Sequence, residues 1–425
     1  MTDRTARSLL RASRDDAGRS RRSGFLLLLV VSSIILSLCM GLRQSLGIFL
    51  PPVTVDLGIS ASAFSFAIAL HNIVCGASQP VVGMLGDRFG ARPVVLGTAV
   101  IYAAGMWLMA TATSALWLDV AGVLIGIGVA GCGFGVLIGL VSRAAAPERR
   151  SQAVGTVAAA GSVATMVLAP LGQTLIVQFG WRTALLVFAA VAALMAVLAL
   201  FLAHEGKKAT PGAAPESDDR PAGLVLRQAL RHPGYIAMTV AFFACGFQLL
   251  FITTHLPSYL QLCGLPPTVG ASALGVIGIC NAIGTYGIGH LGARFSQKRL
   301  LALVYLLRTV AIVLYVLLPP SAATTMIFAA AMGLLWLSVV PLVSGILGRL
   351  FGMRHFNTLN GIVFFSHQLG SFCGAILGGL AYDLTGGYGL GWSGLVAIGL
   401  IAFLLQWQMD ETPPDRIPVG QPATA

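Results

Sequence analysis

The chain has 425 residues, of which 56% are hydrophobic and 10% are charged. Soluble domains carry roughly a quarter charged residues, so this composition excludes an ordinary soluble protein and indicates a membrane protein. The net charge is +11, but the arginines fall in short loops between apolar runs and form no basic face with interleaved aromatic residues, which argues against nucleic-acid binding.

A helix needs about 20 apolar residues to cross the hydrocarbon layer. A basic tail, residues 1–24, precedes the first such run, and the segment 204–231 after the sixth is rich in charged residues, Pro, Ala and Gly, as is typical of a linker. We therefore predict two six-helix halves, 25–203 and 232–408, and a C-terminal tail, 409–425. The twelve predicted spans are 25–50, 61–86, 93–111, 116–142, 153–179, 183–203, 235–261, 269–290, 300–318, 322–348, 357–380 and 391–408.

The basic residues orient these spans. If the N-terminus is inside, 23 of the 26 Lys and Arg residues lie in the tails and loops of the cytoplasmic side. Only Arg182 then lies outside, and Arg43 and Arg308 lie within spans. Since cytoplasmic loops carry an excess of positive charge, we predict a multi-pass protein of the cell membrane with both termini in the cytoplasm.

The second half is a degenerate copy of the first. At an offset of 206 residues, Phe49-Leu50-Pro51 falls on His255-Leu256-Pro257. At the same offset, the segment from Gly83 to Arg92 falls on the segment from Gly289 to Lys298. Because an even number of spans separates the copies, they have the same orientation, and such parallel repeats place the substrate site near the midplane between the halves.

A loop motif connects the chain to a known family. The segment Gly83-Met84-Leu85-Gly86-Asp87-Arg88-Phe89-Gly90-Ala91-Arg92 resembles the loop between the second and third helices of the major facilitator superfamily, and Phe179-Gly180-Trp181-Arg182 is similar to the turn before its sixth helix. The resemblance implies an all-α membrane fold of twelve helices. It also implies that the loop acts as a gating latch, for which the candidate residues are Gly83, Asp87, Arg88, Gly90 and Arg92.

Other residues resemble the branch that contains monocarboxylate porters and oxalate/formate antiporters. Gly122 takes the place of an Arg found four residues before a Gly in many drug and sugar porters, and Arg43 matches a basic residue of the branch. Ser366-His367-Gln368-Leu369-Gly370-Ser371-Phe372 looks like bacterial relatives. The chain departs from the branch in the eighth helix, where Asn281 is followed by Thr285 in place of the usual Arg.

Arg43 and Arg308 are the first substrate-binding candidates. An Arg at the centre of a span costs about 2.5–3.5 kcal/mol on insertion scales, so something in the membrane must offset it. A negatively charged substrate would do so. Snorkelling, or hydrogen bonding to helix carbonyls, is the alternative for both. For Arg308 we expect that glycines of the eighth helix let its guanidinium reach the cavity past Gly284 and Thr285.

Polar side chains on helices that line the cavity in this family form a second group of substrate-binding candidates. They are Gln248, His255, Asn281, Thr285 and His367. Hydrogen bonding between helices, worth about 0.6 kcal/mol on average, is the alternative role for each. The fourth helix carries Gly126, Gly128, Gly131, Gly133 and Gly135, which we interpret as close-packing and bending positions because no Gly-Lys-Ser/Thr follows them.

The acidic residues limit how transport could be coupled to protons. All fifteen Asp and Glu residues lie in tails, loops or span ends. A proton symporter would then need a histidine that titrates near neutrality, among His71, His255 and His367, or a substrate that enters as its neutral acid. Anion exchange or uniport is the alternative.

The sequence thus predicts a secondary active transporter, not an enzyme, that moves a small organic anion, most simply a monocarboxylate, by alternating access. We expect it to act as a monomer in the lipid bilayer without cofactor, metal or nucleic acid, and protons are a further partner only if transport is proton symport. A porter of the same fold for a neutral compound is the first alternative. A non-transporting membrane sensor or a membrane enzyme is the second, although motifs of common hydrolases are absent from the sequence.

Overall fold

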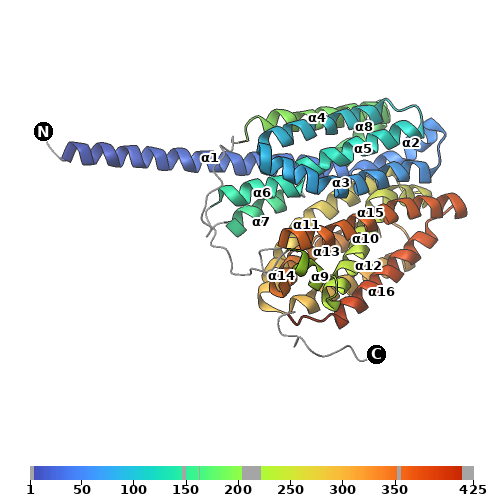
Figure 1. The fold of residues 1–425 in the computed structure, drawn as a ribbon. Coiled ribbons are helices and arrows are strands. Elements are labelled where there is room, and N and C mark those ends of the chain that lie inside the picture. Colours follow the sequence, from blue (N-terminus) through green and yellow to red (C-terminus); the bar gives the residue numbers. More distant parts are fainter. Residues whose placement is uncertain (1–3, 146–149, 162, 203–221, 352–355, 414–425) are drawn as a thin grey trace.

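The computed structural model describes residues 4–145, 150–161, 163–202, 222–351 and 356–413, and these residues contain helices and no strand (Figure 1). Side chains of residues 4–23, of Asp87 and of a few others lie outside the description. The first half contains α1 (Arg4–Gln44), η1 (Leu46–Phe49), α2 (Leu50–Leu57), α3 (Ala61–Phe89), α4 (Ala91–Ala110), α5 (Ala115–Cys132), α6 (Phe134–Ala144), α7 (Arg150–Ala160) and α8 (Val163–Ala199).

The second half contains α10 (Pro233–Leu262), α11 (Pro267–Arg294), α12 (Gln297–Leu317), α13 (Ala322–Leu335), α14 (Val339–Phe351), α15 (Phe356–Thr385) and α16 (Gly389–Gln408). A short helix, α9 (Ala222–Ala229), lies within the segment predicted as a linker. The rest of that segment, up to residue 221, is outside the described residues, as is most of the C-terminal tail.

Eleven stretches of the described chain are long and apolar enough to cross a membrane. One of them, Ala164–Ala199, has 36 residues and is interrupted by a non-helical residue, Gly180, with φ 82° and ψ 162°. Only glycine adopts such a conformation readily. The stretch is therefore two spans joined by a turn, which agrees with the twelve predicted spans.

In each half the helices pack mainly on one another, and two helix pairs make the most extensive contacts between the halves. In the first half, α3 and α4 pack on α5, and α8 packs on α1 and α4. In the second half, α10 packs on α15, α11 on α13 and α12 on α16. Between the halves, α3 lies against α15 and α8 lies against α11. Figure 1 shows the two halves as two stacked layers.

The fourth span depends on glycines for its close packing. A Cβ on Gly122 would lie 2.4 Å from the carbonyl oxygen of Ala67, and one on Gly126 would lie 2.6 Å from that of His71. Small residues let helix backbones approach in membranes, where there is no hydrophobic drive between helices. The close-packing interpretation is confirmed at Gly126, and Gly122 packs in the same way. At Gly135 a Cβ would meet open space, so close packing does not explain that glycine.

The fourth and tenth spans are both broken near their centres. The fourth is interrupted at Gly133, between α5 and α6, and the tenth at residues 336–338, between α13 and α14. Position 133 falls on position 339 at the repeat offset, so the two breaks are equivalent within a few residues. The bending role predicted for Gly133 is thus seen in the structure.

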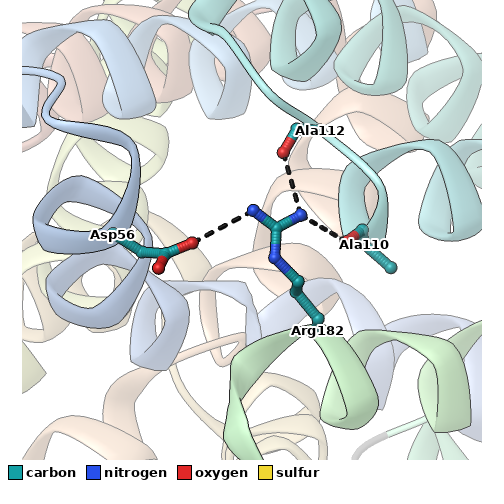
Figure 2. Close-up of polar contacts among 4 residues, drawn as sticks. All are labelled: Asp56, Ala110, Ala112 and Arg182. Carbon is teal, nitrogen blue, oxygen red and sulfur yellow. Dashed lines mark hydrogen bonds and ion pairs between the residues drawn. The ribbon is translucent and has the colours of Figure 1, made fainter.

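At one end of the first half, Arg182 fastens three elements together (Figure 2). Its guanidinium donates to Asp56 Oδ2 at 3.0 Å and to the carbonyls of Ala110 (3.3 Å) and Ala112 (3.1 Å). It also lies over the Trp181 ring, 4.3 Å from the ring centroid. The turn at Gly180 therefore ties α8 to α2 and to the end of α4.

We predict that Arg182→Ala lowers the apparent melting temperature of the purified protein more than Asp56→Asn does. The acid contributes one exposed ion pair, worth about 0–1 kcal/mol, whereas the arginine also holds two carbonyls at the end of α4. Thermal unfolding of the two detergent-solubilised variants measures the difference. Equal shifts would show that the carbonyl contacts contribute nothing.

Candidate functional site

The best candidate site lies where α1, α3 and α15 meet. Arg43, half-buried near the end of α1, donates from Nη2 to Oδ1 of Asn72 on α3. The Asn72 side-chain amide donates in turn to the carbonyl of Ile68 at 2.7 Å, and the backbone carbonyl of Asn72 accepts from Nε2 of Gln368 on α15 at 3.3 Å. Asn72 thus bonds to a cation of the first half with its side chain and to the second half with its backbone.

His367 extends this chain on α15. Its Nδ1 lies 3.3 Å from Oε1 of Gln368 and 3.4 Å from Oγ of Ser371. An amide oxygen can only accept, so Nδ1 of His367 carries the proton of that bond. The ring is 6% exposed and lies between Phe242 and Phe364, with centroids 5.0 and 5.7 Å away.

His71 is the unsatisfied member of the group. It precedes Asn72 on α3, is 1% exposed, and has no hydrogen-bond partner for either ring nitrogen among the described residues. Most buried polar side-chain atoms in folded proteins are paired, so such a group calls for an explanation, such as a water molecule or a ligand.

Arg308 lies elsewhere, inside the second half, and is completely buried. Its Nε and Nη2 donate to the carbonyl of Leu335 at 3.0 and 2.6 Å, Nη2 also contacts the carbonyl of Trp336, and Nη1 lies 3.3 Å from Sγ of Cys245. These carbonyls are at the end of α13, where the tenth span is broken. The guanidinium supplies donors that the interrupted helix lacks.

Asn281 and Thr285 complete that arrangement. Asn281 Oδ1 accepts from the backbone N–H of Leu337 at 2.9 Å and from the Thr285 hydroxyl at 3.3 Å. Gly284 lies so close to α13 that a Cβ would clash with the carbonyl oxygen of Leu334. The glycine therefore brings α13, not the Arg308 side chain, against the eighth span. Three of the predicted site residues meet at the break of the tenth span.

The repeat has an analogous contact in the first half. At the offset of 206, Arg308 falls on Tyr102 and Cys245 falls on Cys39. The Tyr102 hydroxyl donates to the Cys39 carbonyl at 3.3 Å. In both halves a large polar side chain of the third helix reaches the first helix at the same cysteine position.

Gln248 and His255 both bond within the second half. Gln248 Nε2 donates to the carbonyl of Leu395 on α16 at 3.1 Å, and Nε2 of His255 lies 2.7 Å from the carbonyl of Ala375 on α15. The His255 ring packs against Phe251, with centroids 5.2 Å apart. Both side chains have an exposed fraction of 0%.

The predicted latch is described only in part. Gly90 ends α3 and begins α4 with φ +88°, a conformation that favours glycine. Gly83 has open space where a Cβ would lie, Arg88 is exposed over the Phe89 ring, and Arg92 is half-buried. The Asp87 side chain is outside the described residues, so the latch stays a prediction.

Sequence reasoning did not select Asn72 as a site residue. The available signal was an amide in the middle of an apolar run, directly after a histidine that was selected. Its partner in the second half, Gln368, appeared only within the motif that contains His367. An Asn or a Gln in a span does not indicate by itself which neighbouring helix it contacts. Arg43 and Asn72 are also 29 residues apart in the sequence.

We predict that Arg308→Met lowers the free energy of unfolding by about 2–5 kcal/mol, because two buried carbonyls of the broken span lose their donors. Tyr102→Phe, at the equivalent position of the repeat, should cost only about 1 kcal/mol, the value of a single hydrogen bond. Thermal unfolding of the purified variants tests this. An Arg308→Met variant of normal stability that fails only in transport would instead favour contact with a substrate.

Comparison with known proteins identifies the family of the chain. The model of the Major Facilitator Superfamily matches residues 29–340. The chain is 29% identical to monocarboxylate transporter 13 of Bos taurus, covering 83% of this chain and 81% of that protein. It is 30% identical to monocarboxylate transporter 11 of Mus musculus, covering 82% and 79%.

A solved structure shows the same fold. It is a bacterial homologue of the human lysosomal transporter Spinster, in an inward-facing and unoccupied conformation, with a TM-score of 0.74 and 15% identity. The match covers 91% of this chain and 98% of that one. With twelve spans in two parallel repeats and a family model that matches most of its length, this chain belongs to the major facilitator superfamily and is a membrane transporter rather than an enzyme.

Proposed function

We propose that the protein is a secondary active transporter that moves a small organic anion, most simply a monocarboxylate, by alternating access between its two halves. The observation that carries the proposal is Arg43, a half-buried cation between the halves whose described side-chain partner is a neutral amide. An amide leaves the positive charge of the guanidinium uncompensated. A carboxylate would compensate it through charge-assisted hydrogen bonds, roughly twice as strong as neutral ones.

The names of the relatives support an anionic substrate, since two of them are monocarboxylate transporters. The residues of the eighth span suggest that this protein holds its substrate differently from monocarboxylate porters that carry an Arg in this span. Thr285 stands where the usual Arg would be expected, four residues after Asn281, and the two side chains bond to each other beside the break of the tenth span. We infer that Arg43 is the main anion contact and that Arg308 serves the fold.

The contacts of Asn72 indicate how binding could reach the second half. A carboxylate that replaces the Asn72 oxygen at Arg43 would free that amide side chain. The backbone carbonyl of Asn72 is the acceptor for Gln368 and stays in place. Substrate occupancy would therefore change the side-chain contacts of the residue at which the first half bonds to Gln368, and a ligand favours one of two states only through such a difference in contacts.

The proposal also covers the coupling of transport to protons and the membrane in which the protein works. His71 and His367 lie beside Asn72 and Gln368, respectively, and are better placed for protonation linked to substrate binding than His255, which bonds within the second half. Exchange of one anion for another is the alternative coupling. We propose that the monomer works in the cell membrane with both termini in the cytoplasm, as the distribution of basic residues indicates.

We predict that Arg43→Gln lowers uptake of labelled C2–C6 monocarboxylates into proteoliposomes at least about tenfold, the effect of losing one charge-assisted contact. Arg43→Lys, which keeps the charge without the bidentate fork, should be intermediate. Arg182→Gln serves as a control, since it removes an arginine outside the proposed site. Each variant is assayed with and without an imposed pH gradient.

The outcomes separate the candidate functions. Stimulation by an inward proton gradient would support symport, and stimulation by internal carboxylate would support exchange. Transport of neutral compounds with no competition from carboxylates would overturn the anion assignment. Absence of any transport by a stable wild-type protein, across carboxylates and neutral compounds, would instead favour a sensor.

A further inference from the structure

We propose that Asp383 locks one end of the transporter shut by capping the first turn of α3 across the interface between the halves. On the predicted topology this is the extracellular end. The inference rests on the alternating-access part of the proposed function. Its test measures accessibility rather than uptake, so the lock and the substrate assignment can fail separately.

The cap consists of two hydrogen bonds between the first turn of α3, in the first half, and the last turn of α15, in the second half. Oδ1 of Asp383 accepts from the backbone N–H of Ala61 at 3.1 Å, and Oδ2 accepts from that of Ser62 at 2.9 Å. The first N–H groups of a helix have no partner within the helix, and its N-terminus carries partial positive charge. A carboxylate satisfies both needs.

A local cap is already present on α3, so the contribution from Asp383 is additional. The Ser60 side chain accepts from the N–H of Ala63 at 3.1 Å. The carboxylate of Asp383 takes the two preceding N–H groups instead. The first turn of α3 is therefore satisfied partly by its own half and partly by the other half, and separation of the halves would leave two donors to water.

Tight backbone packing surrounds the cap. A Cβ on Gly379, one turn before Asp383, would lie 2.8 Å from Cα of Ser62 and 2.8 Å from Oγ of Ser65. Gly47 lies even closer to the other half, since a Cβ there would clash with the carbonyl oxygen of Thr253. Both contacts join the halves at the same end, so this end is closed by backbone contact and fastened by a charge.

The exposure of Asp383 suits a contact that opens and closes. The residue is exposed, although it bonds to the other half. On release, water can replace the two N–H groups as donors to the carboxylate, which keeps the cost of opening small compared with that of a buried ion pair. At the repeat offset the equivalent residue is Val177, which has no polar side chain, so the second half alone supplies this carboxylate.

The test measures how readily a thiol reagent reaches the interface. Ser65→Cys places a small reporter at a position that is 0% exposed and packs against Gly379. It is built into a Cys263→Ser background, because Cys263 is exposed. The purified protein in nanodiscs is labelled with a polar maleimide, and Asp383→Asn should raise the labelling rate of the reporter about tenfold, which corresponds to about 1.4 kcal/mol.

Two further variants control this measurement. Asp383→Glu keeps a carboxylate and should label more slowly than Asp383→Asn. Asp56→Asn makes the same chemical change in an acid that bonds within the first half, to Arg182, and should leave the rate unchanged. The parent with only the remaining native cysteines reports unfolding. If the rate for Asp383→Asn equals that of the unchanged protein or that of Asp56→Asn, the lock is wrong.

Discussion

The constraint that shapes this protein is that the hydrocarbon layer supplies no hydrogen bonds, so every polar group within it must be satisfied by the protein or by what the protein carries. Regular helices meet this demand for the backbone. Where the tenth span is broken, backbone groups lose their partners within the helix. Arg308 of the ninth span supplies donors for the carbonyl of Leu335, and Asn281 of the eighth span supplies an acceptor for the N–H of Leu337. A buried cation is thus accounted for without a negative partner.

The two membrane arginines separate by the same reasoning. Arg308 is completely buried, and its donors face carbonyls of the broken span and a thiol. Arg43 is half-buried and donates to the side chain of Asn72, whose backbone carbonyl accepts from Gln368 of the other half. The fold thus provides several acceptors for Arg308, whereas the side-chain partner described for Arg43 is one neutral amide. The unpartnered ring of His71 lies next to that second position.

The sequence predicted the spans and their repeat, because hydropathy and the repeat offset follow directly from residue order. It also predicted the close packing at Gly126 and the bend at Gly133, because glycines in a span favour both, but Gly135 has open space around it. It did not predict the break of the tenth span, since residues 336–338 contain neither Gly nor Pro. Nor did it assign a role to Asp383, whose partners lie 321 and 322 residues away. Which neighbour a polar side chain meets depends on tertiary packing.

If charge recognition at Arg43 selects the substrate, a monocarboxylate and its amide, which have nearly the same size, should be transported very differently. Proteoliposomes are preloaded with one compound or the other, and counterflow of the labelled monocarboxylate is measured. We expect the carboxylate to drive counterflow and the amide to drive none. Equal counterflow with both compounds would contradict charge recognition at Arg43.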